Sequence, residues 1–341
     1  MPLAWDKLFF FCQHLHCMLY IISNFESALT QFIFAGLQRD DVRLIQYHSK
    51  PATLAGKLTR WLEVQFPKRR LDWYYPAALR AQLDGIGPGD SVLIFALGNT
   101  KDMVLLGKYL HGKQVHAFLW NPVLEHNTPQ GIAKALERLT AIEQLTPSIY
   151  SFDRADVAQY GLLYAPQPFR HMEAGDAPAA AQSPPTDFFF LGYDKGRLPL
   201  LMRLKQAADT LGLSCHFHIL PDAGKTYSAA EQAMLSTGYL SYADNMALSQ
   251  RARCLIDIVQ ATQSGATMRS VEALFLNKKL ITTRQLALQE PDYNPSRTLV
   301  VDSSTAIDCQ ALLHFMQSPF VPASDAIRTE HEINTWLNRF I

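Results

Sequence analysis

Short runs of consecutive apolar residues alternate along this chain with longer segments in which apolar residues recur at helical spacing. Continuous apolar runs of this length are typical of parallel strands whose sheet is covered by helices on both faces. The pattern predicts two sets of strands. The first set is 18–23, 42–47, 91–97, 115–119 and 148–152, and the second is 187–191, 214–220, 253–259, 279–283 and 298–302.

A stretch rich in alanine and proline separates the two sets at residues 171–186. It holds almost no large apolar side chains, which is typical of a linker between domains. We therefore predict two Rossmann-like α/β domains at 1–170 and 187–341, with residues 1–17 as an extension. The helical patterns after residue 303 are expected to close the second domain. Ligands of such folds bind in the cleft at the carboxyl ends of the strands.

The apolar run at residues 8–22 raises the question of a signal or membrane anchor. A spanning helix needs about 20 apolar residues, and this shorter run contains Gln13, His14 and His16. We expect a short extension followed by a buried strand, with a membrane-contacting segment as the alternative.

Composition narrows the class of protein further. The chain has 341 residues, 48% of them apolar, and its 31 basic residues balance its 31 acidic ones. A nucleic-acid-binding protein normally carries a clear basic excess, so that class is excluded. The cysteines are scattered without a CxxC pair, and the histidines lack metal-ligand spacing. Structural zinc and thiol redox chemistry are therefore not expected, and the cysteine usage indicates the cytoplasm.

The segment 263–283 carries the strongest chemical signal. Its opening turn consists of Gln263, Ser264, Gly265, Ala266 and Thr267. Small residues that lead into a helix offer backbone N–H groups and the positive end of the helix dipole to a diphosphate. Arg269 adds a cation in the first turn, and Glu272 could accept the hydroxyls of a ribose. The alternative is a tight turn followed by an ordinary surface pair of Arg269 with Glu272.

A second turn with unusual chemistry follows the strand at 187–191. Gly192 and Gly196 permit close backbone approach, while Lys195 and Arg197 place two cations at the start of a helix. Cations there oppose the helix dipole, and such a violation is expected where an anion compensates it. A solvated basic turn is the alternative.

These segments resemble the donor-binding domain of bacterial GT-B glycosyltransferases, nearest to those of lipopolysaccharide and capsular polysaccharide biosynthesis. The resemblance rests on LGYDKGR (191–197), YADN (242–245), CLIDIVQATQSGATMRSVEAL (254–274) and KKLITT (278–283). FLWNP (118–122) and YSFDRADVAQYGLLYAPQPF (150–169) extend it into the first half, so that it covers about 90–285. It implies the GT-B architecture, in which two Rossmann-like domains with parallel sheets face each other across a cleft.

The resemblance also implies roles for individual residues. Lys195 and Arg197 would contact the donor phosphates, and the turn Ser264–Thr267 with Arg269 would hold the diphosphate or the sugar. Glu272 would bind the ribose. The remaining predicted donor-side residues are Gly192, Gly196, Asp257, Gln263 and Tyr242. Tyr242 would either pack on the base of the nucleotide or be a tyrosine of the core. The E-x7-E motif of several retaining families is missing, because Ser264 occupies the position eight residues before Glu272 where the first glutamate would stand. This leaves the stereochemical outcome open.

The first domain should bind the acceptor and supply a general base. Candidates lie in loops after strands, and Glu26 and His126 are the first choices. A helix cap, a turn residue or a solvated polar group is the commoner role for such residues and is the alternative for each of them. The cluster KRRLDWYYP (68–76) is either a solvated patch or a contact with anionic lipid.

Together these features predict metal-independent transfer of a sugar from a nucleotide-activated donor to a hydroxyl of a growing cell-surface glycan. No cofactor is expected, and the lack of a DxD-type aspartate pair agrees with a reaction without metal. The acceptor would be an oligosaccharide or a lipid-linked glycan, reached in the cytoplasm or peripherally at the cytoplasmic face of the inner membrane. The alternatives are a sugar-nucleotide epimerase, a polysaccharide pyruvyltransferase, or a non-catalytic protein that binds glycans or nucleotide sugars.

Overall fold

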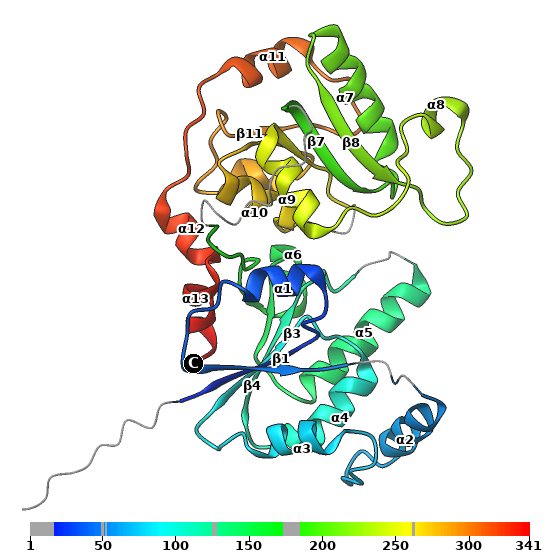
Figure 1. Ribbon diagram of the computed structural model, residues 1–341, viewed down its shortest axis with the longest axis vertical. Helices are drawn as coiled ribbons and strands as arrows, with labels where there is room; N and C mark the ends of the chain where they lie inside the picture. The colour runs from blue at the N-terminus through cyan, green and yellow to red at the C-terminus, as the bar shows by residue number, and fades with distance from the viewer. Residues whose placement is uncertain (1–16, 49–50, 52, 125–127, 173–184, 261–262) are drawn as a thin grey trace, which may run out of the picture.

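The computed structural model describes residues 17–48, 51, 53–124, 128–172, 185–260 and 263–341. Within them the chain forms two α/β domains, the N-terminal one below the C-terminal one in Figure 1. Each strand predicted from the apolar runs is present, with ends that differ by a few residues. The structure adds one short strand that the pattern did not indicate, β6, which contributes two residues at the edge of the first sheet.

The N-terminal domain is built on a six-stranded sheet of order β2-β1-β3-β4-β5-β6, in which every pair is parallel. The strands are β1 (Leu19–Ser23), β2 (Val42–Gln46), β3 (Ser91–Phe95), β4 (Gln114–Leu119), β5 (Ile149–Ser151) and β6 (Leu163–Tyr164). The helices are α1 (Ala28–Phe34), α2 (Leu54–Gln65), α3 (Ala77–Asp84), α4 (Thr100–Leu110), α5 (Pro129–Glu143) and α6 (Arg154–Tyr160).

The C-terminal domain is built on a five-stranded parallel sheet of order β11-β10-β9-β7-β8. Its strands are β7 (Thr186–Tyr193), β8 (Cys215–Leu220), β9 (Ala252–Asp257), β10 (Lys279–Thr282) and β11 (Thr298–Val300). Its helices are α7 (Leu198–Thr210), α8 (Ala229–Gln232), α9 (Tyr242–Arg251), α10 (Met268–Leu276), α11 (Cys309–Gln317) and the 3-10 turn η1 (Gln285–Gln289).

Burial of both sheet faces explains why the strands are continuous apolar runs. In β3, Val92 and Ile94 join the core formed with α3, α4 and α5, whereas Leu93 and Phe95 join a second core on the opposite face. Successive side chains of a strand point to opposite faces, so a strand that is covered twice has no polar side.

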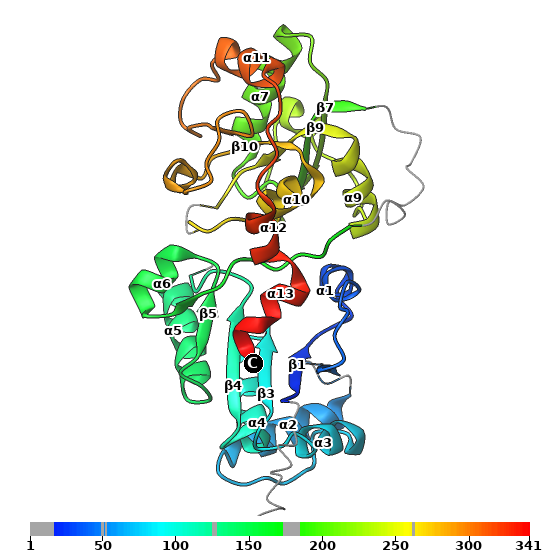
Figure 2. The same cartoon turned by 90° about the vertical axis from the view of Figure 1, so that its left-hand side faces the viewer.

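The end of the chain departs from the predicted domain boundaries. After α12 (Asp325–His331), the helix α13 (Ile333–Trp336) and the turn η2 (Leu337–Phe340) return to the N-terminal sheet, as Figures 1 and 2 show. The buried Trp336 ring lies 5.0 Å from that of Phe118, and its Nε1 donates to the carbonyl of Pro166 (2.7 Å). The prediction that residues 187–341 form one domain is therefore wrong for this segment. A helical pattern alone does not reveal which sheet the helix covers.

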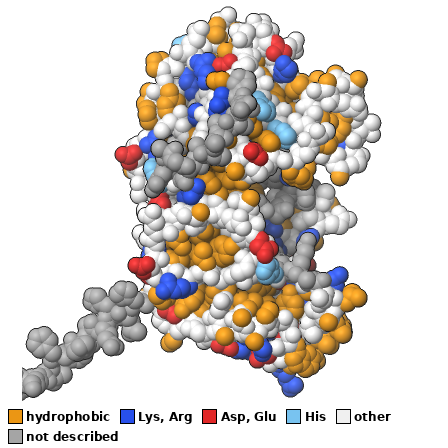
Figure 3. All heavy atoms as spheres, viewed as in Figure 1, with side chains coloured by type: hydrophobic (Ala, Val, Ile, Leu, Met, Phe, Trp, Pro, Cys, Tyr) orange, Lys and Arg blue, Asp and Glu red, His pale blue; other side chains and the backbone are white. Residues whose placement is uncertain are grey.

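The N-terminal domain exposes large apolar side chains on one part of its surface. They gather over α2 and the loop that follows it, at the lower right in Figure 3. Among the described residues, none of the helices has the length and apolar character needed to cross a membrane.

We expect Trp336→Ala to destabilise the N-terminal domain by about 3–5 kcal/mol, because it leaves a cavity between η2 and the sheet. Denaturant unfolding followed by circular dichroism measures this loss. The exposed Val321, in the segment before α12, provides the matched control: Val321→Ala should change the free energy of unfolding by no more than about 0.5 kcal/mol. Equal losses for the two variants would contradict the docking of the chain end on the first sheet.

Candidate functional site

A cavity of about 230 Å³ lies at the carboxyl ends of β7 and β9, beside the first turn of α10. We call it the β9 cavity. Six of the residues predicted to bind a donor line it, namely Arg197, Asp257, Gln263, Thr267, Arg269 and Glu272. Two segments that are about 60 residues apart in sequence, at 197 and 257, thus meet in one cavity, as expected for the carboxyl ends of neighbouring parallel strands.

A second cavity of about 300 Å³ adjoins the first and lies between the domains. Its lining combines Trp120, Asn121, Pro122, Phe152 and Gln167 of the N-terminal domain with Lys195, Gln260, Gln263, Thr267 and Met268 of the C-terminal domain. We call it the interdomain cavity. Because Gln263, Thr267 and Met268 line both cavities, a ligand in one can reach the other.

Asp257 holds the start of α10 in place. Its buried carboxylate accepts hydrogen bonds from the hydroxyls of Thr267 (2.9 Å), Ser270 (2.9 Å) and Thr282 (3.2 Å). Thr267 is in turn the N-cap of α10 and accepts from the N–H of Arg269 (3.1 Å). Asp257 therefore lies at the site, as predicted, but its contacts with three hydroxyls give it a positioning role.

Glu272 is buried and already holds three donors. Oε1 accepts from the hydroxyl of Tyr242 (3.0 Å) and from Nδ2 of Asn245 (3.2 Å), and Oε2 accepts from Nη1 of Arg269 (2.6 Å). A carboxylate has about four acceptor sites. Two further ribose hydroxyls would thus require that one present donor be released.

Arg269 and Tyr242 are accordingly committed to contacts within the protein. Nη1 of Arg269 also donates to Asn245 Oδ1 and to Ser249 Oγ, both at 3.1 Å. The Tyr242 ring lies 4.8 Å from that of Phe32 in α1, across the domain boundary. Burial, followed by the nearby Glu272 carboxylate, raises the pKa of Tyr242 well above its usual range, so the phenol stays protonated and donates.

Arg197 lies at the opposite wall of the β9 cavity. Its Nε donates to the carbonyl of Ile258 (2.8 Å) and its Nη1 to that of Tyr193 (3.2 Å). Gly192 leaves room for this guanidinium, since a Cβ there would stand 3.3 Å from Nη1. Burial lowers the pKa of Arg197, although the surrounding carboxylates act in the opposite direction. The hydrogen bonds that Arg197 makes with the described residues go to neutral carbonyls, and a cation placed in this way favours the approach of an anion.

Lys195 stands at the tip of the turn between β7 and α7, where its exposed side chain borders the interdomain cavity. Lys195 and Gly196 both have positive φ, +41° and +80°, which explains the glycine. The anion expected at this helix start is partly internal: the Asp194 carboxylate accepts from the N–H of Leu198 (2.9 Å) and from Lys225. Burial raises the pKa of Asp194, but these contacts outweigh it and the pKa is lowered.

The turn before α10 also holds an anion, and it comes from the other domain. The buried Asp153, N-cap of α6, accepts at Oδ2 from the N–H groups of Ser264 (2.6 Å) and Gly265 (2.9 Å), and its Oδ1 contacts the Ser264 hydroxyl. We predicted these N–H groups to be open to a diphosphate; in this structure they are occupied. The tendency of the turn to bind an anion was foreseen, but its partner was not.

Of the two predicted bases, only Glu26 is described. Its side chain is 68% exposed, and Oε2 lies 3.7 Å from Nδ1 of His48, whose side chain is 56% exposed. Neither residue lines the β9 cavity or the interdomain cavity. His126 lies outside the described residues.

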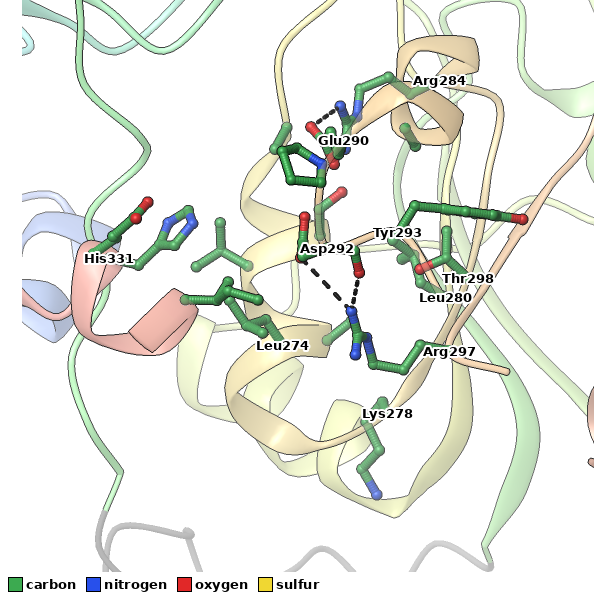
Figure 4. A pocket seen from close by; sticks show the side chains of 18 of the residues that line it. Leu274, Lys278, Leu280, Arg284, Glu290, Asp292, Tyr293, Arg297, Thr298 and His331 are labelled. Carbon is green, nitrogen blue, oxygen red and sulfur yellow. Dashed lines mark hydrogen bonds and ion pairs between the residues drawn. The ribbon is translucent and has the colours of Figure 1, made fainter. Parts of the chain in front are cut away.

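A further cavity, of about 340 Å³, lies on the other side of α10, and nothing in the sequence indicated it. Figure 4 shows Arg284 directed at Glu290, Arg297 at Asp292, and His331 entering from α12. Arg284 binds Glu290 through both terminal nitrogens, at 2.6 and 2.9 Å. Arg284 and Arg297 are thus paired with carboxylates, whereas Lys278 donates to the carbonyl of Gln250 and Arg154 lies over the Tyr164 ring.

Sequence reasoning missed Asp153, Trp120 and Gln167. All three occur in the segments that carry the resemblance, yet nothing in those segments shows which residues they face in the other domain. Within the described part of the chain, no cluster of three or more His, Cys, Asp or Glu side chains could hold a metal ion.

Comparison with solved structures identifies the architecture. The chain is similar to an α,α-trehalose-phosphate synthase (UDP-forming) from Burkholderia vietnamiensis, at 11% identity over 95% of this chain and 96% of that one, with a TM-score of 0.55. A similar enzyme from Burkholderia xenovorans, in complex with glucose-6-phosphate, gives 12% identity, 94% and 98% coverage and a TM-score of 0.54. No protein-family model and no curated protein matches the sequence. At this identity the likeness establishes the fold, which is GT-B.

We expect Gly265→Ala to force the domains apart, because a Cβ there would stand 2.7 Å from both Cδ2 and the carbonyl oxygen of Phe152. Small-angle X-ray scattering should show a larger radius of gyration, and stability should fall by about 1–3 kcal/mol. Gly89→Ala is the matched control, since nothing lies within 4 Å of its Cβ. An unchanged scattering profile for Gly265→Ala would show that the domains do not depend on this close approach.

Proposed function

We propose that this protein is a glycosyltransferase that moves a sugar from a nucleotide-activated donor to a hydroxyl of a growing cell-surface glycan. The observation that carries the proposal is the β9 cavity, in which Arg197, Gln263 and Thr267 meet at the start of α10. This is the place where open α/β folds bind nucleotides. The neighbours of known structure bear the description UDP-forming, so UDP is the first nucleotide to test.

In this proposal the donor diphosphate lies between Lys195, Arg197 and the first turn of α10. Negative charge develops on the departing nucleoside diphosphate as its bond to the sugar breaks, and fixed cations and N–H groups that point there stabilise this charge. Lys195 is exposed at the border of the interdomain cavity, and Arg197 donates to the carbonyls of Tyr193 and Ile258. These two cations supply what a divalent ion would otherwise provide, so we propose a reaction without metal or cofactor.

The donor's ribose would lie toward Glu272, deeper in the β9 cavity. Its carboxylate is held by Tyr242, Asn245 and Arg269, which fixes its orientation before a ligand arrives. Release of one of these donors would allow both ribose hydroxyls to bind. Arg269 then acts as a positioning residue for Glu272, because its contacts lie within the protein.

The acceptor would approach from the N-terminal domain, through the interdomain cavity. Trp120 offers an aromatic surface to a sugar ring, and Gln167 is buried with its Oε1 lacking a hydrogen-bond partner among the described residues. An orphaned buried acceptor favours a ligand hydroxyl. The acceptor class that fits is an oligosaccharide or a lipid-linked glycan. Glu26 and His126 stay the candidate bases.

We expect UDP to raise the thermal unfolding temperature of the protein, since a ligand at 100 times its Kd adds about 2.7 kcal/mol to native-state stability. Lys195→Ala should weaken UDP binding about 10- to 100-fold through loss of a charge-assisted hydrogen bond. Lys205→Ala, on the outer face of α7 where Lys205 pairs with Asp209, is the matched control and should bind UDP like the parent. The absence of a response to UDP, GDP, CMP and dTDP alike would overturn the proposal.

We expect Gln167→Leu to raise the acceptor KM at least tenfold, because the variant removes the unpartnered amide oxygen of the interdomain cavity. Its Kd for UDP should stay unchanged. The matched control is Gln206→Leu on the exposed surface of α7, which should change neither the acceptor KM nor the Kd for UDP. The assay follows transfer from a labelled UDP-sugar to a glycan acceptor. Conversion of the donor without any acceptor would indicate an epimerase and contradict the transfer reaction.

A further inference from the structure

Helix α2 exposes an apolar stripe instead of burying it. Leu54, Leu58 and Trp61 follow one another at spacings of four and three residues, which places them on one side of the helix. Their exposed fractions are 81%, 58% and 53%, and Phe66 and Trp73, in the loop after α2, are 46% and 58% exposed. We call these five side chains the α2 face. Apolar side chains that gather on a surface in this way indicate a contact surface.

The loop carrying Trp73 is fixed to the helix. Oε1 of the buried Glu63 accepts from the backbone N–H groups of Trp73 (2.5 Å) and Tyr74 (3.1 Å). The helix itself is held to α4, where Lys108 donates to the carbonyl of Glu63 (2.7 Å) and Asp102 pairs with Arg60. The α2 face is therefore a preformed surface of the N-terminal domain.

The charge around the α2 face is positive, although the whole chain is neutral. Residues 54–73 contain five Lys or Arg residues and two carboxylates, the buried Glu63 and Asp72, which pairs with Arg70. Arg60 and Arg70 are paired with Asp102 and Asp84. Lys57, Lys68 and Arg69 remain exposed next to the apolar side chains, and Figure 3 shows Lys or Arg side chains at the border of this apolar area.

We propose that the α2 face docks the protein on the surface of an anionic lipid bilayer. The helix lies in the plane of the interface, with Leu54, Leu58 and Trp61 inserted below the headgroups. Tryptophan favours this depth because its ring is apolar and its N–H is polar. Lys57, Lys68 and Arg69 contact the anionic headgroups. This inference rests on the surface alone and is independent of the proposed sugar transfer.

The charges favour a lipid surface over a second copy of this chain. In a symmetric dimer built on the α2 face, the same patch would face itself, so the cations of one protomer would oppose those of its partner. A bilayer containing anionic lipid covers the apolar side chains and neutralises the cations at the same time. Self-association is therefore an outcome that the test must be able to detect.

The test measures co-sedimentation of the full-length protein with vesicles of phosphatidylcholine alone and of phosphatidylcholine mixed equally with phosphatidylglycerol. The protein should bind the mixed vesicles at least tenfold more tightly than the neutral ones. High salt should weaken this binding, because salt screens charges at the membrane surface. Analytical ultracentrifugation without lipid should show a monomer at the same concentration.

Two variants locate the contact. Removing the cations, in Lys57→Gln/Lys68→Gln/Arg69→Gln, should weaken partitioning onto the mixed vesicles roughly 100-fold, since each basic residue contributes about fivefold. Removing the apolar anchors, in Leu58→Ser/Trp61→Ser, should weaken it at least tenfold, whereas Val321→Ser at an exposed site near α12 should leave it unchanged. The three variants should unfold at the temperature of the parent.

The proposal is overturned by any of three results. The first is that the parent protein fails to bind the mixed vesicles. The second is that both α2 variants bind as tightly as the parent, which would place the contact elsewhere in the chain. A concentration-dependent dimer that the Leu58→Ser/Trp61→Ser variant abolishes would identify the α2 face as an interface between copies. Nucleotide binding, measured in parallel, stays unchanged in these variants whichever result is obtained.

Discussion

The arrangement of the two domains depends on one buried carboxylate. Asp153 of the N-terminal domain accepts the N–H groups of Ser264 and Gly265 at the start of the turn that leads into α10. Each hydrogen bond to a charged group contributes about 1.5–3 kcal/mol, and a buried carboxylate without them would be strongly unfavourable. The contact requires a glycine at 265, because the backbone of Phe152 and Asp153 occupies the space of a Cβ. It thereby sets how far apart the walls of the interdomain cavity stand.

The same contact links the domain arrangement to the chemistry of the site. The start of α10 attracts anions, and the Asp153 carboxylate already occupies it. A ligand phosphate must therefore either bind beside Asp153, at Thr267 and Met268, or displace it. Displacement would remove the hydrogen bonds that Asp153 forms with Ser264 and Gly265 of the other domain. Binding beside Asp153 would place two negative charges close together, which only cations such as Lys195 and Arg197 can offset. Both routes make the position of the N-terminal domain responsive to an anion in the cleft.

The sequence of this protein predicts local structure far better than it predicts which distant residues contact one another. The strands were predictable because both sheets are covered on both faces, which leaves each strand an apolar run such as Ser91–Phe95. The preference of two turns for an anion was also predictable, since it arises from local N–H groups. The anions themselves, Asp194 and Asp153, were not. Asp153 is 111 residues away from Ser264, and nothing in the sequence around a helix N-cap shows which distant residues its side chain contacts. The domain against which Trp336 packs could not be predicted for the same reason.

The path of the chain restricts how the domains can move. It crosses between them twice, once after β6 and once before α13, and the two crossings are bonded to each other. The N–H of Phe169 donates to the carbonyl of His331 (2.7 Å), and the N–H of Ile333 donates to that of Phe169 (2.8 Å). Since both crossings pass through one place, a change in the cleft must pivot there, with Trp336 anchored below in the first core. The Asp153 contact is the part of the interface that such a rotation can open without unfolding either sheet.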